Sequence, residues 1–323
     1  MLQNTIHSVD LLSNPKFKEF IDAFTNICKA SQELPLTEAR RLSTQFFLSE
    51  GTIYEPISRI ENVEILSKQG HKIPLRIFTP SSSEPLPALV YFHRGGFVFG
   101  NIEEADPVCR KLANHLRCVV VAVEYRLCPE YPFPKPLEDC YEATEWVSEN
   151  VDRFGGDSER LIVCGESVGG NLAAAVTLMA RDNCGPSLSA QLLICPAITA
   201  DIKDEPYDNS ADCYFLTKDA MKFFWSVYLQ SPENRQNVYA SPDLVTDFSN
   251  LPPMLVITAE HDPLQFEAME YAEKLRQSGV KVISKSFPEV IHGFIDLPTY
   301  DETQKIEWIK EIAVLLKKLE IGK

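Results

Sequence analysis

Short runs of apolar residues separated by longer amphipathic segments organise the chain from about residue 88 onward. Five of these runs are continuous and uncharged: Ala88–Phe92, Cys118–Val123, Leu161–Cys164, Leu192–Cys195 and Met254–Ile257. Continuous apolar runs are typical of strands buried on both faces, and the segments between them carry helical patterns. This alternation predicts an α/β fold with a mostly parallel sheet.

Segments at both ends of this region extend the expected sheet. Glu61–Leu66 and Ile73–Phe78 alternate in character and precede the parallel part, which favours an antiparallel pair at one edge. A last β pattern covers Val280–Phe287, and a final helix is expected from about Thr303 to Leu319. We expect that helix to cover the sheet.

Two helical regions fall outside the β/α alternation. Residues 1 to about 50 read as helical, with Thr37 as a candidate N-cap, and they form either a dispensable arm or a lid. Between Pro206 and Pro232 lies a second helix that no strand follows until after Pro252. Its aromatic stripe, which includes Phe224, either packs on the core or walls a pocket.

Charge and cysteine content exclude several classes of function. The 323 residues carry a net charge of −15, which argues against binding nucleic acid or an anionic membrane surface. No apolar run approaches a membrane span, and no secretory signal is visible. Nine scattered cysteines without a C-x-x-C pair favour reduced thiols in a cytoplasm and lack the spacing of a zinc site.

The sequence Gly165-Glu166-Ser167-Val168-Gly169 lies between an apolar strand and a helix-forming run. A serine on such a turn projects its hydroxyl above the sheet edge, and the flanking glycines leave room for a close approach. The N–H of Val168, at the start of the helix, then points to where an oxyanion would form. The alternative, a chance match in a loop, is disfavoured by the strand and helix on either side.

A glycine-rich loop directly follows the strand Ala88–Phe92, with the sequence His93-Arg94-Gly95-Gly96-Phe97. At the carboxyl end of a strand it should lie beside the serine turn. The N–H groups of Gly95 and Gly96 would then join that of Val168 in a three-donor oxyanion hole. The alternative interpretation is a glycine turn needed only for packing.

A serine nucleophile needs a base, and the chain has six histidines. His292 stands in a late loop beyond the last β pattern, beside a glycine and an aromatic residue, and is the best candidate. Asp262 follows the strand Met254–Ile257 and can hold the imidazole, with Glu260 as the alternative. The chain order Ser167, Asp262, His292 is that of α/β-hydrolases.

Taken together, these sequences resemble the hormone-sensitive-lipase family of α/β-hydrolase carboxylesterases. Residues 93–97 match its H-G-G-G-[FW] loop, 125–130 with 132–134 and 138–139 match Y-R-L-A-P-E…P-F-P…E-D, and 165–171 match G-D-S-A-G-G-N. Asp262-Pro263-Leu264 and His292-Gly293-Phe294 match D-P-L and H-G-F. The resemblance runs from about residue 60 to the C-terminus.

The resemblance implies an α/β-hydrolase fold: a mostly parallel eight-stranded sheet flanked by helices, with a helical cap. On this view residues 1–50 are a cap segment and 51–323 are the core, with a cap insertion at about 203–235. The implied activity is serine-dependent hydrolysis of short-chain acyl or aryl esters, with no metal and no cofactor. Phe97, Phe224 and Phe294 are then candidates for the substrate pocket.

Two alternatives to this activity stay open on the same sequence. The machinery also suits amides, thioesters or acetylated sugars, and a non-catalytic small-ligand receptor on this fold is the alternative from another class. Whether two copies associate into a homodimer is likewise undecided by the sequence.

The chain departs from the family pattern at four positions. Arg94 replaces the first glycine of the loop, Glu166 replaces aspartate, and Val168 replaces alanine. Phe266 stands where the family often has a second acid, which puts a supporting interaction in doubt. None of the four removes a proposed catalytic group.

Overall fold

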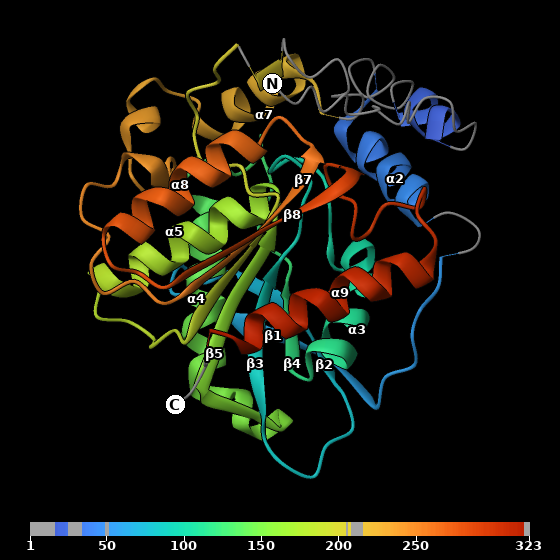
Figure 1. Cartoon of the computed structure of the whole chain (residues 1–323), viewed down its shortest axis with the longest axis vertical. Helices are drawn as coiled ribbons and strands as arrows, with labels where there is room; N and C mark the ends of the chain where they lie inside the picture. Colours follow the sequence, from blue (N-terminus) through green and yellow to red (C-terminus); the bar gives the residue numbers. More distant parts are fainter. Residues whose placement is uncertain (1–16, 25–33, 49–51, 205, 208–215, 320–323) are drawn as a thin grey trace, which may run out of the picture.

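A single eight-stranded sheet forms the centre of the molecule (Figure 1). The computed structural model describes residues 17–24, 34–48, 52–204, 206–207 and 216–319. The strands, in chain order, are β1 (Arg59–Leu66), β2 (Lys72–Thr79), β3 (Leu86–Phe92), β4 (Val119–Val123), β5 (Gly156–Glu166), β6 (Ala190–Ile194), β7 (Met254–His261) and β8 (Val282–Ile291). The strand count predicted from the sequence is confirmed.

The strands lie in the order β1-β2-β4-β3-β5-β6-β7-β8. β1 pairs with β2 and β2 with β4 in antiparallel fashion, and every other neighbouring pair is parallel. The two segments of alternating character, β1 and β2, therefore form the antiparallel edge. This is expected, because an antiparallel strand can expose one face to water while it buries the other. The continuous apolar runs form the buried centre, where β4 and β6 have no exposed residue.

Helices cover both faces of the sheet. Helices α3 (Ile102–Leu116) and α9 (Glu302–Lys317) contact each other and pack on one face. Helices α4 (Lys135–Asn150), α5 (Val168–Asp182) and α8 (Gln265–Gln277) pack on the other (Figure 1). The last helix covers the sheet as predicted, and it begins one residue earlier than expected.

Two further helices lie at the end of the molecule toward which the arrowheads of β7 and β8 point (Figure 1). Helix α2 (Leu36–Phe47) is joined to the loop after β3 by Arg40, whose Nε donates to the carbonyl of Val98 at 2.8 Å. Helix α7 (Lys218–Leu229) contacts the same loop through Tyr228, whose ring stacks on Phe97 with centroids 3.7 Å apart. Both helices thus pack directly on the glycine-rich loop.

The N-cap prediction for α2 is wrong. The helix begins at Leu36, with Pro35 and not Thr37 at the cap position. The carbonyl of Pro35 accepts from the N–H groups of Glu38 and Ala39 at 2.9 and 3.0 Å. Proline has a fixed φ, here −54°, and its carbonyl accepts the first hydrogen bonds of the helix, two residues before Thr37.

The aromatic stripe of the second unpaired helix packs on the core. Met221, Trp225 and Tyr228 are almost fully buried, whereas Phe224 is only partly buried. Phe224 lies instead against the glycine-rich loop. The core interpretation is therefore confirmed for the buried side chains of this stripe, and a pocket wall at Phe224 stays a prediction.

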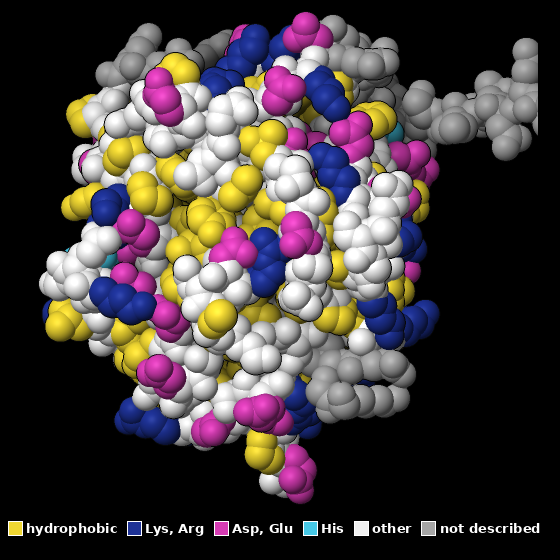
Figure 2. Space-filling model, turned by 90° about the vertical axis from the view of Figure 1, so that its left-hand side faces the viewer, with side chains coloured by type: hydrophobic (Ala, Val, Ile, Leu, Met, Phe, Trp, Pro, Cys, Tyr) yellow, Lys and Arg dark blue, Asp and Glu magenta, His cyan; other side chains and the backbone are white. Residues whose placement is uncertain are grey.

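Figure 2 shows one face of the surface, where acidic and basic side chains lie beside one another with apolar groups between them. The acidic surplus does not gather into one patch on that face. Within the described ranges, helices fall short of the length and hydrophobicity needed to cross a bilayer. The seven cysteines of those ranges are free thiols, and all but Cys184 are buried.

Candidate active site

Ser167 occupies the turn that joins β5 to α5. Its backbone φ of 58° and ψ of −121° lie outside the ordinary regions for a residue with a side chain, so the turn stores strain. The turn is tight enough that a Cβ on Gly169 would lie 2.0 Å from the carbonyl oxygen of Phe92. The sequence-predicted turn is therefore present, and its second glycine is required by the close approach of β3.

The side chain of His292 joins Ser167 to Asp262. Its Nε2 lies 2.9 Å from the Ser167 hydroxyl oxygen, and its Nδ1 lies 2.8 Å from Oδ2 of Asp262. The other carboxylate oxygen, Oδ1, accepts from the N–H of Leu264 at 2.9 Å. All three side chains are buried, so these contacts are shielded from water. The structure thus brings together the three residues that the sequence singled out.

Glu260, the alternative acid, lies elsewhere. Its side chain is exposed, and its Oε2 accepts from the N–H of Glu289 at 2.9 Å. Asp262 is the carboxylate that faces the imidazole. An ionised carboxylate accepts only, so the proton of this contact sits on Nδ1 and leaves Nε2 free to accept from the serine hydroxyl.

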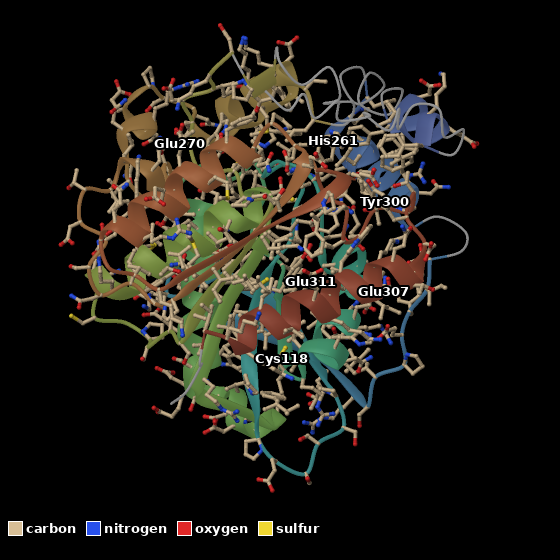
Figure 3. The ribbon with its side chains drawn as sticks, in the orientation of Figure 1. Cys118, His261, Glu270, Tyr300, Glu307 and Glu311 are labelled. Carbon is tan, nitrogen blue, oxygen red and sulfur yellow. The ribbon has the colours of Figure 1, made fainter. Side chains whose placement is uncertain are left out.

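Tyr300 connects the loop that carries His292 to helix α9. The phenol oxygen of Tyr300 accepts from the N–H of Ile291 at 3.1 Å, and its ring packs against Trp308 of α9. Figure 3 labels Tyr300 between the end of β8 and α9. The histidine is therefore held by the helix layer under the sheet as well as by Asp262.

The glycine-rich loop turns back on itself next to the serine. Gly95 and Gly96 have φ values of 128° and 64°, and the carbonyl of Gly95 accepts from the N–H groups of Val98 and Phe99. Among the residues that the structure describes, no protein group accepts from the N–H of Gly95 or of Gly96. Two amide donors of this loop are therefore available to a ligand.

His93 holds this loop and takes no part in the serine–histidine–aspartate chain. Its Nδ1 donates to the carbonyl of Arg94 at 2.8 Å, and its ring stacks on Tyr125 with centroids 4.2 Å apart. The Tyr125 hydroxyl donates to the carbonyl of His93 at 2.7 Å. Burial lowers the pKa of the His93 imidazole to about 4, so it is neutral at neutral pH.

The three pocket candidates have different surroundings. Phe224 lies over the glycine-rich loop, where its ring carbons approach the position that a Cβ on Gly96 would occupy to within 2.3 Å. Phe97 is fully buried between Trp225 and Tyr228. Phe294 is fully buried against Phe287 and Trp308, in the core between the sheet and α9. Of the three, Phe224 alone belongs to an unpaired helix and contacts the glycine-rich loop from that helix.

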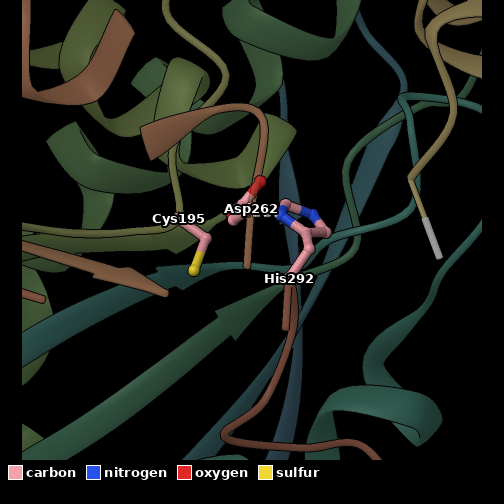
Figure 4. A group of neighbouring side chains, drawn as sticks. All are labelled: Cys195, Asp262 and His292. Atoms are coloured by element: carbon pink, nitrogen blue, oxygen red, sulfur yellow. Dashed lines mark hydrogen bonds and ion pairs between the residues drawn. The ribbon is translucent and has the colours of Figure 1, made fainter. Parts of the chain in front are cut away.

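Cys195, which the sequence analysis did not consider, lies beside Asp262 and His292 (Figure 4). Its thiol follows β6 and is 1% exposed. Burial, together with the Asp262 and Glu166 charges, raises the pKa of this thiol well above its usual range, so the thiol is neutral. Ligand atoms of the three side chains lie within 4.8 Å of one another, a spacing that a metal ion also accepts. The 2.8 Å contact between imidazole and carboxylate is a hydrogen bond, which fits the triad and not a bridging metal.

Glu267, on α8, holds the segment that follows β6. Phe266 is exposed, whereas the Glu267 carboxylate accepts from the N–H groups of Ile198 and Thr199 at 2.6 and 3.4 Å. These two amides belong to the segment that follows β6. The exposed Phe266 side chain takes no part in these contacts.

A serine on the turn after β5, an acid after β7 and a histidine after β8 define a serine hydrolase with the α/β-hydrolase fold. A family model described as alpha/beta hydrolase fold matches residues 89–296. The chain belongs to the hormone-sensitive-lipase family of α/β-hydrolase carboxylesterases.

Relatives match over nearly the whole chain. Carboxylesterase NlhH of Mycobacterium tuberculosis is 34% identical over 302 residues, which cover 92% of each chain. Ethyl acetate hydrolase of Pseudomonas putida is 32% identical over 87% of this chain and 92% of its own. A hyperthermophilic esterase from the archaeon Pyrobaculum calidifontis superposes with a TM-score of 0.82 at 39% identity, over 90% of this chain and 95% of that one.

Proposed function

We propose that this protein hydrolyses carboxylic esters through an acyl-enzyme on Ser167. The observation that carries the proposal is the unbroken chain of hydrogen bonds from the Ser167 hydroxyl through His292 to Asp262, at 2.9 and 2.8 Å. The names of the relatives, carboxylesterase and ethyl acetate hydrolase, support the same reaction.

In the first half-reaction, the Ser167 oxygen attacks the ester carbonyl carbon while Nε2 of His292 takes the hydroxyl proton. The carbonyl oxygen becomes an oxyanion, and the N–H groups of Gly95, Gly96 and Val168 stabilise it. When the tetrahedral intermediate collapses, the bond to the alcohol oxygen breaks and His292 returns its proton to that oxygen. The alcohol leaves and the acyl group stays on Ser167.

The second half-reaction repeats these steps with water. His292 takes a proton from water, the hydroxide attacks the acyl carbon, and collapse releases the carboxylic acid as Ser167 regains its proton. Asp262 stabilises the imidazolium in both halves. Every step uses side chains and amides of this chain, with no metal and no cofactor.

For the substrate we propose short-chain acyl or aryl esters. The names of two relatives, ethyl acetate hydrolase and arylesterase, support this choice. We further propose that residues 1–50 and about 203–235 form the two parts of a cap over the core. Support comes from α2 and α7, which both contact the loop after β3.

Labelling with a fluorophosphonate tests this function directly. The activated serine should react, and mass spectrometry should find one phosphonyl group on Ser167. A matched panel of ester, amide, thioester and acetylated-sugar substrates then separates the alternative hydrolases. A small-ligand receptor on this fold would leave the probe unreacted, and that outcome would refute the proposal.

Two expectations have weaker support and need their own measurements. A cytoplasmic location fits the free thiols at the described cysteines, and cell fractionation tests it. A homodimer remains a prediction, which sedimentation equilibrium tests.

A further inference from the structure

The guanidinium of Arg94 lies at a junction of three segments of the site. It belongs to the oxyanion loop, and its Nη2 donates to Oδ2 of Asp296 at 3.1 Å, on the loop that follows His292. Its Nε lies 3.6 Å from Oε2 of Glu166, the residue before the nucleophile. The side chain is 11% exposed, Asp296 is 10% exposed and Glu166 is fully buried. One cation thus bridges the oxyanion loop, the serine turn and the base loop.

Arg94 also balances charges that would otherwise be uncompensated. Burial raises the pKa of Glu166 to about 7, and the Arg94 charge is the largest opposing influence. Burial likewise raises the pKa of Glu104, and Arg94 again opposes it most strongly. Tyr91, whose hydroxyl lies 3.4 Å from Glu166, and His292 also face this carboxylate. A neutral residue at position 94 would therefore leave several carboxyl groups in low dielectric without their cation.

The third contact of Arg94 leads to helix α2. The guanidinium carbon lies 4.0 Å from the centre of the Phe47 ring, in the last turn of that helix. Nearby, the Thr44 hydroxyl donates to Glu104 at 2.7 Å. Stacking of arginine on an aromatic face is attractive and depends on distance. The position of α2 is thereby connected to the same cation that bridges the catalytic segments.

We propose that Arg94 is a positioning residue, which sets the distances between the oxyanion loop, the serine turn and the His292 loop. Through Phe47, the same residue makes these distances depend on the position of α2. The planar guanidinium suits this role because its donors point in fixed, different directions. The family pattern has glycine at this position, so the link is a feature of this chain. The inference rests on the roles proposed above for Ser167 and His292.

The test compares Arg94→Met, Arg94→Lys and Phe47→Leu with a matched control, Arg76→Met. Arg76 has a side chain of similar burial and pairs with Glu103 and Asp106, but it lies on β2 away from the site. With p-nitrophenyl butyrate, Arg94→Met should lower kcat by about tenfold or more while KM changes by less than about threefold. Arg94→Lys should have a kcat between those of Arg94→Met and the wild type, because lysine keeps the positive charge but lacks the planar guanidinium with its several donors. Arg76→Met should lower Tm and leave kcat unchanged.

A double-mutant cycle tests the connection to α2. Phe47→Leu keeps an apolar side chain but removes the ring face, and it should lower kcat by a smaller factor than Arg94→Met. In the Arg94→Met background the same change should have no further effect on kcat, since the interaction is already lost. Independent, multiplicative effects would overturn the connection to α2.

Wild-type kcat in a folded Arg94→Met protein, or an equal loss in Arg76→Met, would overturn the positioning role. If Arg94→Met does not fold, Arg94→Lys and Phe47→Leu carry the test, and wild-type kcat in both overturns the inference. The rate of fluorophosphonate labelling separates this outcome from a failure of the proposed function. A reactive Ser167 with an unchanged labelling rate in the Arg94 variants refutes the positioning role alone.

Discussion

The ring of Phe224 lies directly over the backbone of Gly96, so closely that a Cβ at position 96 would come within 2.3 Å of it. Gly96 also has a φ of 64°, which side chains rarely adopt. We predict that Gly96→Ala lowers kcat/KM for p-nitrophenyl butyrate by about 100-fold, the effect of displacing one oxyanion donor.

The double variant Gly96→Ala/Phe224→Ala separates the effect of the clash with the Phe224 ring from the effect of the positive φ at position 96. Removing the ring relieves the clash and leaves only the backbone strain, about 1 kcal/mol. Part of the lost kcat/KM should therefore return, with Phe224→Ala alone as the reference. Full activity in Gly96→Ala would contradict the assignment of Gly96 to the oxyanion hole.

The three residues Ser167, His292 and Asp262 should act as one unit. Ser167→Ala and His292→Ala should each lower kcat for p-nitrophenyl butyrate by about 10⁶-fold. Asp262→Asn should lower it by about 10⁴-fold through the wrong imidazole tautomer. Ser167→Ala/His292→Ala should be no worse than either single change. Circular dichroism and Tm check that each variant is folded. Additive losses would argue that the groups do not share one reaction step.

His93 should make the protein sensitive to acid. Burial lowers the pKa of its imidazole to about 4 in the folded state, whereas the unfolded value is about 6.5. The unfolded chain therefore binds the extra proton first, and folded-state stability falls as pH drops from about 6.5 toward 4. The integrated loss is about 3 kcal/mol.

In His93→Gln, the side chain at position 93 does not titrate between pH 6.5 and 4. The free energy of unfolding of this variant should start lower than that of the wild type at pH 7, because the ring contacts are lost, and should then fall less steeply toward pH 4. Urea titrations at half-unit pH intervals measure the difference. Parallel slopes for the two proteins would show that His93 does not contribute to acid sensitivity.

Cys195 should support Asp262 without taking part in the chemistry. Its buried, neutral thiol lies within 4.8 Å of that carboxylate. Cys195→Ala should lower the free energy of unfolding by about 1–2 kcal/mol through the lost contact and volume. Its kcat should stay within about tenfold of the wild type, in contrast to Asp262→Asn. A 10³-fold loss of kcat in Cys195→Ala would assign the thiol a catalytic role.

The features that could be predicted from the sequence are those that a local residue pattern determines, such as the buried strands and the serine turn. Runs such as Cys118–Val123 have only one structural interpretation, a strand buried on both faces, and β4 forms there. The turn at Ser167 was recognisable because a strand, two glycines and a helix follow one another within a few residues. His292 and Asp262 were found by elimination and chain order, and their measured contacts agree with that choice.

The remaining features depend on contacts between residues far apart in the chain. Arg94 and Asp296 are separated by 202 positions, so no pattern near either residue indicates their hydrogen bond. The same reason explains why two other contacts were not predicted from the sequence. Cys195 lies beside Asp262, and Glu267 accepts hydrogen bonds from the segment that begins at Ile198. Phe97 and Phe294 flank motif residues, but sequence adjacency does not tell which way a ring points, and both rings lie in the core.

The proposed catalytic side chains follow three different strands, β5, β7 and β8. Two of the proposed oxyanion donors, Gly95 and Gly96, follow a fourth strand, β3, and the third, Val168, follows β5. No single hairpin or helix pair of the chain holds two of the three triad groups, so a partly assembled sheet cannot hydrolyse an ester. Recovery of turnover after dilution from denaturant should consequently lag behind recovery of helical circular dichroism, which makes catalysis itself a reporter of the last step of sheet assembly.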